Sequence, residues 1–175
     1  MCSMTELSSA SEDPAKIDDT DLQILALLQE DGRMSLADMA KKIDKGVSTI
    51  HARMKRLKQD GVIKQYTTIV NPVKLQRNTL GIILVTVRYR APGQRGGLSQ
   101  REFCEEIAKH PLVQEVHVLS GEFDVLLKVR TKDVSEMNEF IVDFLREIPA
   151  VERTLTMFAL DTYLDTLELR NLTVS

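Results

Sequence analysis

Basic side chains gather in one short stretch, "STIHARMKRLKQDGVIK", which spans residues 48–64. Its only acid is Asp60. Its cations are Arg53, Lys55, Arg56, Lys58 and Lys64. Ammonium and guanidinium groups at this density bind phosphates, and both can also donate hydrogen bonds to the edge of guanine. The stretch therefore indicates contact with a polyanion.

The net charge of the whole chain has the opposite sign. The 175 residues carry 23 basic and 26 acidic side chains, a net charge of −3. Residues 33–64 hold nine of the basic and only three of the acidic side chains, so the remainder carries 14 against 23. This asymmetry predicts one polyanion-binding module joined to a second module that avoids polyanions.

Helical spacing divides the basic stretch into two faces. Ile50, Met54 and Leu57 form an apolar stripe, and the opposite face carries small and basic side chains of the kind that a recognition helix presents to the major groove. The candidate DNA contacts are Ser35, Lys45, Ser48, Thr49, His51, Ala52, Arg53, Lys55, Arg56 and Lys58. Arg53 is ambiguous, because it can reach a phosphate or pair with an acid of the first helix.

Two helices are predicted upstream of this one. The first begins at Asp18, with Asp21 three residues later, and ends near Gly32; the second is capped by Ser35. The tight connection "IDKG" then leads to the third helix, which is the pattern of a helix-turn-helix. After Gly61, "VIKQYTTIV" predicts an extended strand.

The second half predicts a different architecture. Strands are expected at residues 80–89, in "VQEVHVL", in "DVLLKVR" and in the final "VERTLTMFALDTYL". Helices are expected after Ser99, which forms a capping box with Glu102, and over "VSEMNEFIVDFLREI", which Asp133 caps. The order is βαββαβ, the ferredoxin-like split unit. One sheet face takes both helices, and the other is apolar enough to need a cover, most simply a second copy.

Several functional classes are disfavoured by composition. No apolar run approaches the ~18 residues of a membrane span, and the polar N-terminus does not resemble a secretory signal. The two cysteines, Cys2 and Cys104, suit a reducing cytoplasm. The histidines and cysteines lack metal-ligand spacing, and nucleophile-elbow and phosphate-loop motifs are absent, so we expect no enzyme, metal or cofactor.

Two alternative functions remain beside a regulator, and the role of one loop is open. RNA-binding modules share the βαββαβ order but need exposed aromatic residues, of which these strands offer only Tyr89. An architectural DNA-binding protein with little sequence preference would need only phosphate contacts. The loop "RAPGQRGG" (90–97) is either a connector or an anion site.

Four segments, taken in order, resemble the Lrp/AsnC (leucine-responsive/asparagine regulator) family of prokaryotic transcription regulators. They are "IDDTDLQILALLQEDGRMSLADMAKKI", "STIHARMKRLKQDGVIKQY", "VNPVKL" and "LSGEFDVLLKV". The resemblance implies an α+β chain with four parts. These are a disordered tail (1–16), a winged-type three-helix helix-turn-helix domain (17–65), a strand linker (66–78) and a ferredoxin-like βαββαβ domain for effector sensing and oligomerisation (79–175).

The family resemblance also implies partners. Members bind promoter or operator DNA in the nucleoid, form dimers and often tetramers or octamers, and commonly respond to amino acids bound between dimers. By this resemblance the effector-binding residues are Ser120, Gly121, Glu122, Asp124, Thr154 and Thr156. Ser120 and the amides near Gly121 suit a carboxylate, and Glu122 or Asp124 suits an ammonium group. His117 is a further neighbour, although a lone histidine on a strand is more often a surface residue.

Three features depart from the family pattern. The turn before the recognition helix is Asp44-Lys45-Gly46, so the weaker cap Gly46 is expected at the helix start. Gln76 stands where the family often has glycine. The loop "RAPGQRGGLSQ" (90–100) after the first sheet strand is longer than usual.

Overall fold

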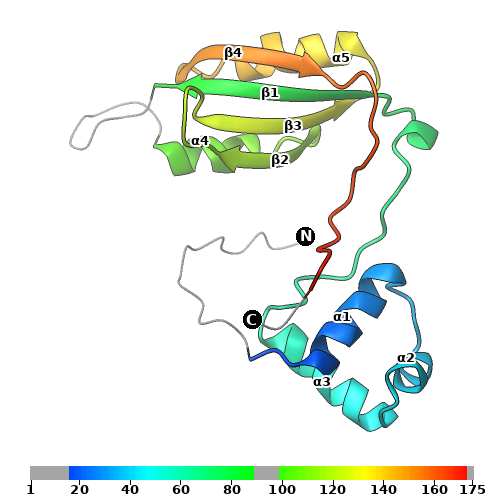
Figure 1. The fold of residues 1–175 in the computed structure, drawn as a ribbon. Helices are drawn as coiled ribbons and strands as arrows, with labels where there is room; N and C mark the ends of the chain where they lie inside the picture. The colour runs from blue at the N-terminus through cyan, green and yellow to red at the C-terminus, as the bar shows by residue number, and fades with distance from the viewer. Residues whose placement is uncertain (1–15, 89–98, 173–175) are drawn as a thin grey trace. The chain divides into compact units, whose positions relative to one another are not determined.

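The computed structural model describes residues 16–88 and 99–172 (Figure 1). Most of the predicted N-terminal tail and the loop at 90–97 lie outside these residues. The chain divides into two compact units: one comprises the residues up to Ile69 and resumes at Thr166, and the other runs from Val70 to Asp165. The sheet domain was predicted to extend to residue 175, whereas residues 166–172 group with the first unit.

The first unit contains three helices, as predicted. They are α1 (Asp19–Glu30), α2 (Leu36–Ile43) and α3 (Val47–Gln59). Asp18 and Asp21 form the expected reciprocal capping box, in which each carboxylate accepts the other residue's backbone N–H at 3.0 and 3.1 Å. Gly46 begins α3 without a side-chain cap. The helices bury a shared apolar core, whose fully buried members are Ile24, Met39, Ile50 and Leu57.

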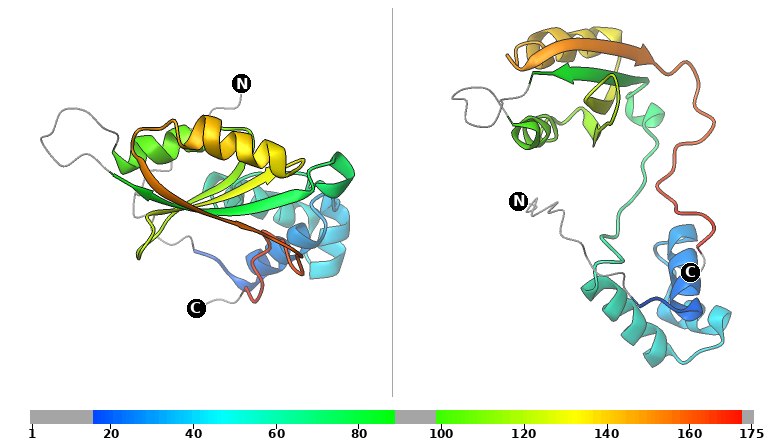
Figure 2. Two further views of the ribbon diagram at one scale, coloured as in Figure 1. Left: turned by 90° about the horizontal axis from the view of Figure 1, so that it is seen from above. Right: turned by 60° about the vertical axis from the view of Figure 1, so that its left-hand side comes forward.

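The second unit is an antiparallel sheet with helices on one face, as Figure 2 shows. Its elements are β1 (Thr79–Val87), α4 (Gln100–Ile107), β2 (Val113–Val118), β3 (Val125–Thr131), α5 (Val134–Glu139) and β4 (Val151–Phe158). The strand order β2-β3-β1-β4 is that of the βαββαβ unit, so the predicted fold class is confirmed. Ser99 and Glu102 cap α4 with the predicted capping box.

The two faces of the sheet differ in what covers them. On the helix side, Ile83 of β1 and Leu127 of β3 are fully buried together with Phe103 of α4. On the other side, Leu84 of β1 is flanked by Leu126 and Leu155 in the strand register, and Leu155 is 44% exposed. An apolar strip thus runs across the face that carries no helix.

The prediction of a strand in the segment between the two units is wrong for the single chain. The strand expected after Gly61 does not form in the single chain, because an extended segment becomes a strand only when a neighbour pairs with it. A short 3-10 turn (Val73–Leu75) follows, and Asn71 Oδ1 accepts its first amide at 3.0 Å. Gln76 then adopts a left-handed conformation, φ 56°, in which glycine is the least strained residue. This conformation explains why glycine suits the position.

The predicted helix after Asp133 also departs from expectation. It starts as α5 but continues as a π-helical turn, Phe140–Leu145, in which the Arg146 amide donates to the Ile141 carbonyl at 3.0 Å. Phe140 and Leu145 are both buried. Because a π-turn has more residues per turn than an α-helix, these two side chains, five positions apart, both face the core. Among the described residues, no helix has the length and apolarity needed to cross a membrane.

Candidate nucleic-acid interface

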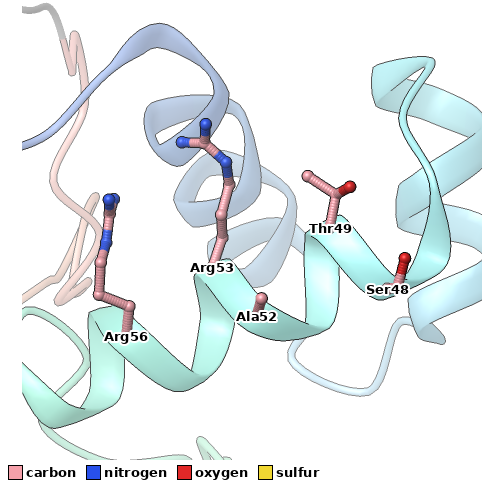
Figure 3. A pocket seen from close by; sticks show the side chains of 5 residues that line it. All are labelled: Ser48, Thr49, Ala52, Arg53 and Arg56. Carbon is pink, nitrogen blue, oxygen red and sulfur yellow. The ribbon is translucent and has the colours of Figure 1, made fainter.

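Helix α3 presents the surface that the sequence predicted. Ile50 and Leu57 are buried against α1 and α2, and the opposite face is exposed. A shallow hollow of about 490 Å³ on this unit is lined by Ser48, Thr49, Ala52, Arg53 and Arg56. Figure 3 shows these side chains along the helix, with the small ones near its N-terminal end. Small residues at the start of a recognition helix allow the backbone to approach base edges.

The lysines near α3 divide into free and engaged groups. Within the part of the chain that the structure describes, neither Lys45 nor Lys55 has an ion-pair partner, and both are exposed. Lys58 instead lies over the ring of Tyr66, with its Nζ 5.2 Å from the ring centroid. His51 and Ser35 are exposed, and Ser35 caps α2. Among the lysines predicted to contact DNA, Lys45 and Lys55 are therefore the ones most available to a phosphate or a base.

The two arginines of α3 are held by the start of α1. Arg53 Nη1 lies 2.6 Å from Asp18 Oδ2 and 3.0 Å from Asp21 Oδ1. Arg56 Nη2 forms a short ion pair with the other oxygen of Asp21. Arg53 thus pairs with acids of the first helix, which was one of its two predicted roles, and Arg56 does the same. If these guanidinium groups contact DNA, they must do so while they are also paired with the carboxylates of Asp18 and Asp21.

Asp21 is the centre of this network. Its side chain is fully buried, and it accepts from two guanidinium groups and from the backbone amide of Asp18. A buried carboxylate is stable only when such partners replace its lost water. The network therefore fixes the start of α1 against the middle of α3, and so fixes the orientation of the exposed face.

The ion pair of the neighbouring Asp18 predicts that the stability of this unit falls at acid pH. The hydrogen bond from Arg53 is the largest of several influences that lower the pKa of Asp18 from 3.8 to about 2. Because the folded-state pKa lies below the unfolded value, the stabilisation is complete above pH 3.8 and is lost as pH falls toward about 2. We expect Asp18→Asn, which keeps an N-cap, to flatten this part of the pH profile. Urea midpoints from pH 5 to about pH 2 measure this.

The exposed Asp19 supplies the control for this measurement. Asp19→Asn leaves the ion pairs intact, so its profile should parallel that of the wild-type protein. If Asp18→Asn also parallels the wild-type profile, Asp18 is not the source of the acid sensitivity.

The second candidate site is the turn between β2 and β3. The turn is closed by the Leu119 amide, which donates to the Asp124 carbonyl at 2.8 Å, and Gly121 has φ 152° at its apex. Asp124 Oδ2 accepts the backbone N–H of Val87 at 2.8 Å, so this carboxylate already ties the turn to β1. Ser120 and Glu122 are exposed. Ser120 and Glu122 therefore face solvent, whereas the Asp124 carboxylate is held by β1.

An arginine beside this turn was missed from the sequence. Arg153 of β4 donates to Glu122 at 2.8 Å, and its guanidinium lies 4.8 Å from the Phe123 ring centroid. Arg153 lies on β4, two strands away from β3 in the sheet, so no local sequence pattern linked it to the turn.

The predicted threonines lie on β4. Thr154, the next residue after Arg153, pairs with Val85 and points to the opposite face of the sheet from Arg153, and Thr156 follows two residues on. His117 is exposed and lies 3.1 Å from Glu115. No hydrogen bond among the described residues joins either threonine to the turn.

Comparisons with known proteins identify both units. Residues 17–64 match the family description "Winged helix-turn-helix DNA-binding", and residues 84–169 match "Lrp/AsnC ligand binding domain". Together with the three-helix unit and its exposed α3, these matches define a helix-turn-helix DNA-binding transcription regulator. The chain belongs to the Lrp/AsnC family. Because this is a family of transcription regulators, the prediction that the chain is not an enzyme is confirmed.

Individual relatives cover nearly the whole chain. The HTH-type transcriptional regulator FL11 of Pyrococcus furiosus is 39% identical over 153 residues, which are 87% of this chain and 95% of FL11. The transcriptional regulator NMB0573 of Neisseria meningitidis, solved with L-methionine, is 26% identical with a TM-score of 0.80 and covers 87% of this chain and 96% of its own. LrpC of Bacillus subtilis is 25% identical with a TM-score of 0.71 and covers 87% and 99%.

Proposed function

We propose that this regulator binds discrete operator sequences through α3 and changes its activity when an amino acid binds to the sheet domain. The observation that carries the proposal is the exposed face of α3, where Ser48, Thr49 and Ala52 leave room for base edges beside the unpaired Lys55. Further phosphate contacts come from lysines such as Lys45. The working location is the nucleoid in the cytoplasm of a prokaryotic cell.

The active form in this proposal is a homodimer. The apolar strip around Leu84, Leu126 and Leu155 lies on the sheet face without helices, and burying it against a second copy would satisfy both copies at once. The extended segment at 66–70 would gain a pairing partner in the same assembly. Tetramers or octamers would then form from dimers.

The effector is proposed to bind at the turn between β2 and β3. NMB0573, a relative of the same fold, was solved with L-methionine, which supports an amino acid as the ligand class. The Ser120 hydroxyl and the amides near Gly121 suit the carboxylate of such a ligand. Glu122 is the exposed acid for its ammonium group, and Arg153 must release Glu122 for that contact. Thr154 and Thr156 contribute hydroxyls only from a neighbouring copy or after a local change.

An architectural role with little sequence choice is the second candidate. It is favoured by the same unpaired lysines, because phosphate contacts alone would hold such a protein on any duplex. Footprinting on the DNA upstream of its own gene separates the two. A regulator protects a discrete site with a repeat of about 10 base pairs, whereas an architectural protein covers all sequences evenly.

The amino-acid response is measured on the same DNA. Operator affinity and oligomer size are recorded at fixed salt with a panel of amino acids that includes L-methionine. We expect at least one amino acid to shift affinity about fivefold or more, and Glu122→Gln to reduce that shift. Glu147→Gln, a change of another exposed acid of the sheet unit, should respond like wild type. A panel that changes neither quantity in the wild-type protein contradicts the sensing role.

A further inference from the structure

A pocket of about 670 Å³ lies in the sheet unit, away from the turn between β2 and β3. Residues from the start of β2 and the end of β3 line it, among them Gln114 and Arg130, whereas the turn joins the other ends of these strands. Figure 1 shows that turn and the 3-10 turn before β1 at opposite ends of the sheet. The pocket is thus separate from the proposed effector site, and its volume falls in the range of about 300–1,000 Å³ typical of small-molecule sites.

Three rings form an apolar wall of this pocket. The ring of His110 lies 4.8 Å from that of Phe140 and 4.4 Å from that of Phe144, between centroids. Burial lowers the pKa of His110, so its ring is uncharged at neutral pH and behaves as part of the wall. Pro72 and Leu112 extend the apolar surface. An occupant with a flat apolar body would find stacking partners here.

The positive and negative charges of the side chains that line the pocket do not cancel. Arg77 is paired with Glu136 at 2.9 Å. Arg130 is engaged by Asp165 at 3.3 Å and by the carbonyl of Arg77 at 3.5 Å.

The remaining acids of the lining are Glu139 and Asp143, both exposed. No hydrogen bond or ion pair within residues 16–88 and 99–172 engages either carboxylate. The available charge beside the rings is therefore negative, which favours a cation.

The backbone that carries these groups is unusual. Phe140, Asp143 and Phe144 all belong to the π-helical turn, and Glu139 immediately precedes it. A π-turn is rare in proteins and is frequently found at functional sites. Here it places two rings and a carboxylate on one wall of the same pocket.

We propose that this pocket binds a small organic cation with a flat apolar body, whose ammonium group lies at Glu139 and Asp143 and whose ring packs on Phe144 and His110. The proposal goes beyond the amino-acid response at the turn, because it places a second ligand class at the opposite end of the sheet. The pocket also includes Val70 and Leu75 of the segment leading from the DNA-binding unit, so an occupant would contact that segment.

Tryptamine, tryptophol and indole-3-acetate test the proposal as matched cationic, neutral and anionic probes. The chain contains no tryptophan, so the indole emission of each probe can be followed directly on the full-length protein. We expect tryptamine to bind about tenfold more tightly than tryptophol, and indole-3-acetate to bind more weakly than both. Titrations without DNA make this outcome independent of the proposed regulatory function.

The double variant Glu139→Gln, Asp143→Asn removes both charges while preserving side-chain shape. We expect it to weaken tryptamine binding about tenfold and to leave tryptophol binding unchanged. Glu147→Gln removes an exposed acid outside the pocket and should bind tryptamine as wild type does. The proposal is overturned if tryptamine does not bind, if tryptophol binds equally well, or if the double variant retains wild-type affinity while its circular dichroism is unchanged.

Discussion

Replacing Ala52 with glutamate should weaken binding of operator DNA on the order of a hundredfold. Ala52 is exposed on the face of α3 opposite the buried Ile50 and Leu57, between the small residues at the helix start and Lys55. A carboxylate at this point would meet the negative potential of the groove, and its length would keep the helix backbone away from base edges. Fluorescence anisotropy with the footprinted site, at one fixed salt concentration, measures the effect.

The matched control is Ala26→Glu. Ala26 is likewise exposed within a helix, α1, so this variant adds the same charge and carries the same small propensity cost. It should bind DNA within about threefold of wild type, since a remote surface charge changes mainly the long-range attraction. Equal affinities for the two variants would mean that α3 does not enter the groove by this face.

Asp21→Asn should lower the free energy of unfolding of the first unit by about 2 kcal/mol. The substitution keeps the size of the side chain but leaves Arg53 and Arg56 facing a neutral amide at a fully buried position. It also weakens the reciprocal cap at the start of α1. Urea unfolding followed by circular dichroism at pH 7, with hydrogen exchange of α1 and α3, reports the loss.

Asp19→Asn serves as the comparison for this change as well. Asp19 is an exposed acid in the same helical turn, and its interaction with the helix dipole is worth less than about 1 kcal/mol. A loss of similar size in both variants would show that general helix electrostatics, and not the buried network, stabilises this unit.

Local patterns account for what the sequence predicted well. The capping boxes at Asp18–Asp21 and Ser99–Glu102 each involve residues three positions apart, so their spacing is readable directly. The two faces of α3 and the βαββαβ order follow from periodicity in the same way. The prediction of a strand after Gly61 was wrong because a strand needs a pairing partner, and the local sequence pattern does not indicate whether one is present.

Features that depend on distant segments were not predictable. The ion pair of Arg56 with Asp21 spans 35 positions, and helical spacing alone placed Arg56 on the DNA side. Arg153 reaches Glu122 across 31 positions. The ring wall of the second pocket likewise requires His110 to meet the π-helical turn, which no residue spacing indicated.

The contact between α1 and the C-terminal segment has a consequence for biosynthesis. The Gln29 side chain donates to the Leu169 carbonyl at 3.1 Å and accepts the Leu169 amide at 2.8 Å, joining residues 140 positions apart. The three helices can form while the ribosome is still translating the sheet domain, because their contacts are local. The contact of Gln29 with Leu169 must wait until residue 169 has been made. The first unit therefore gains its contact with Leu169 only after the sheet domain has been synthesised.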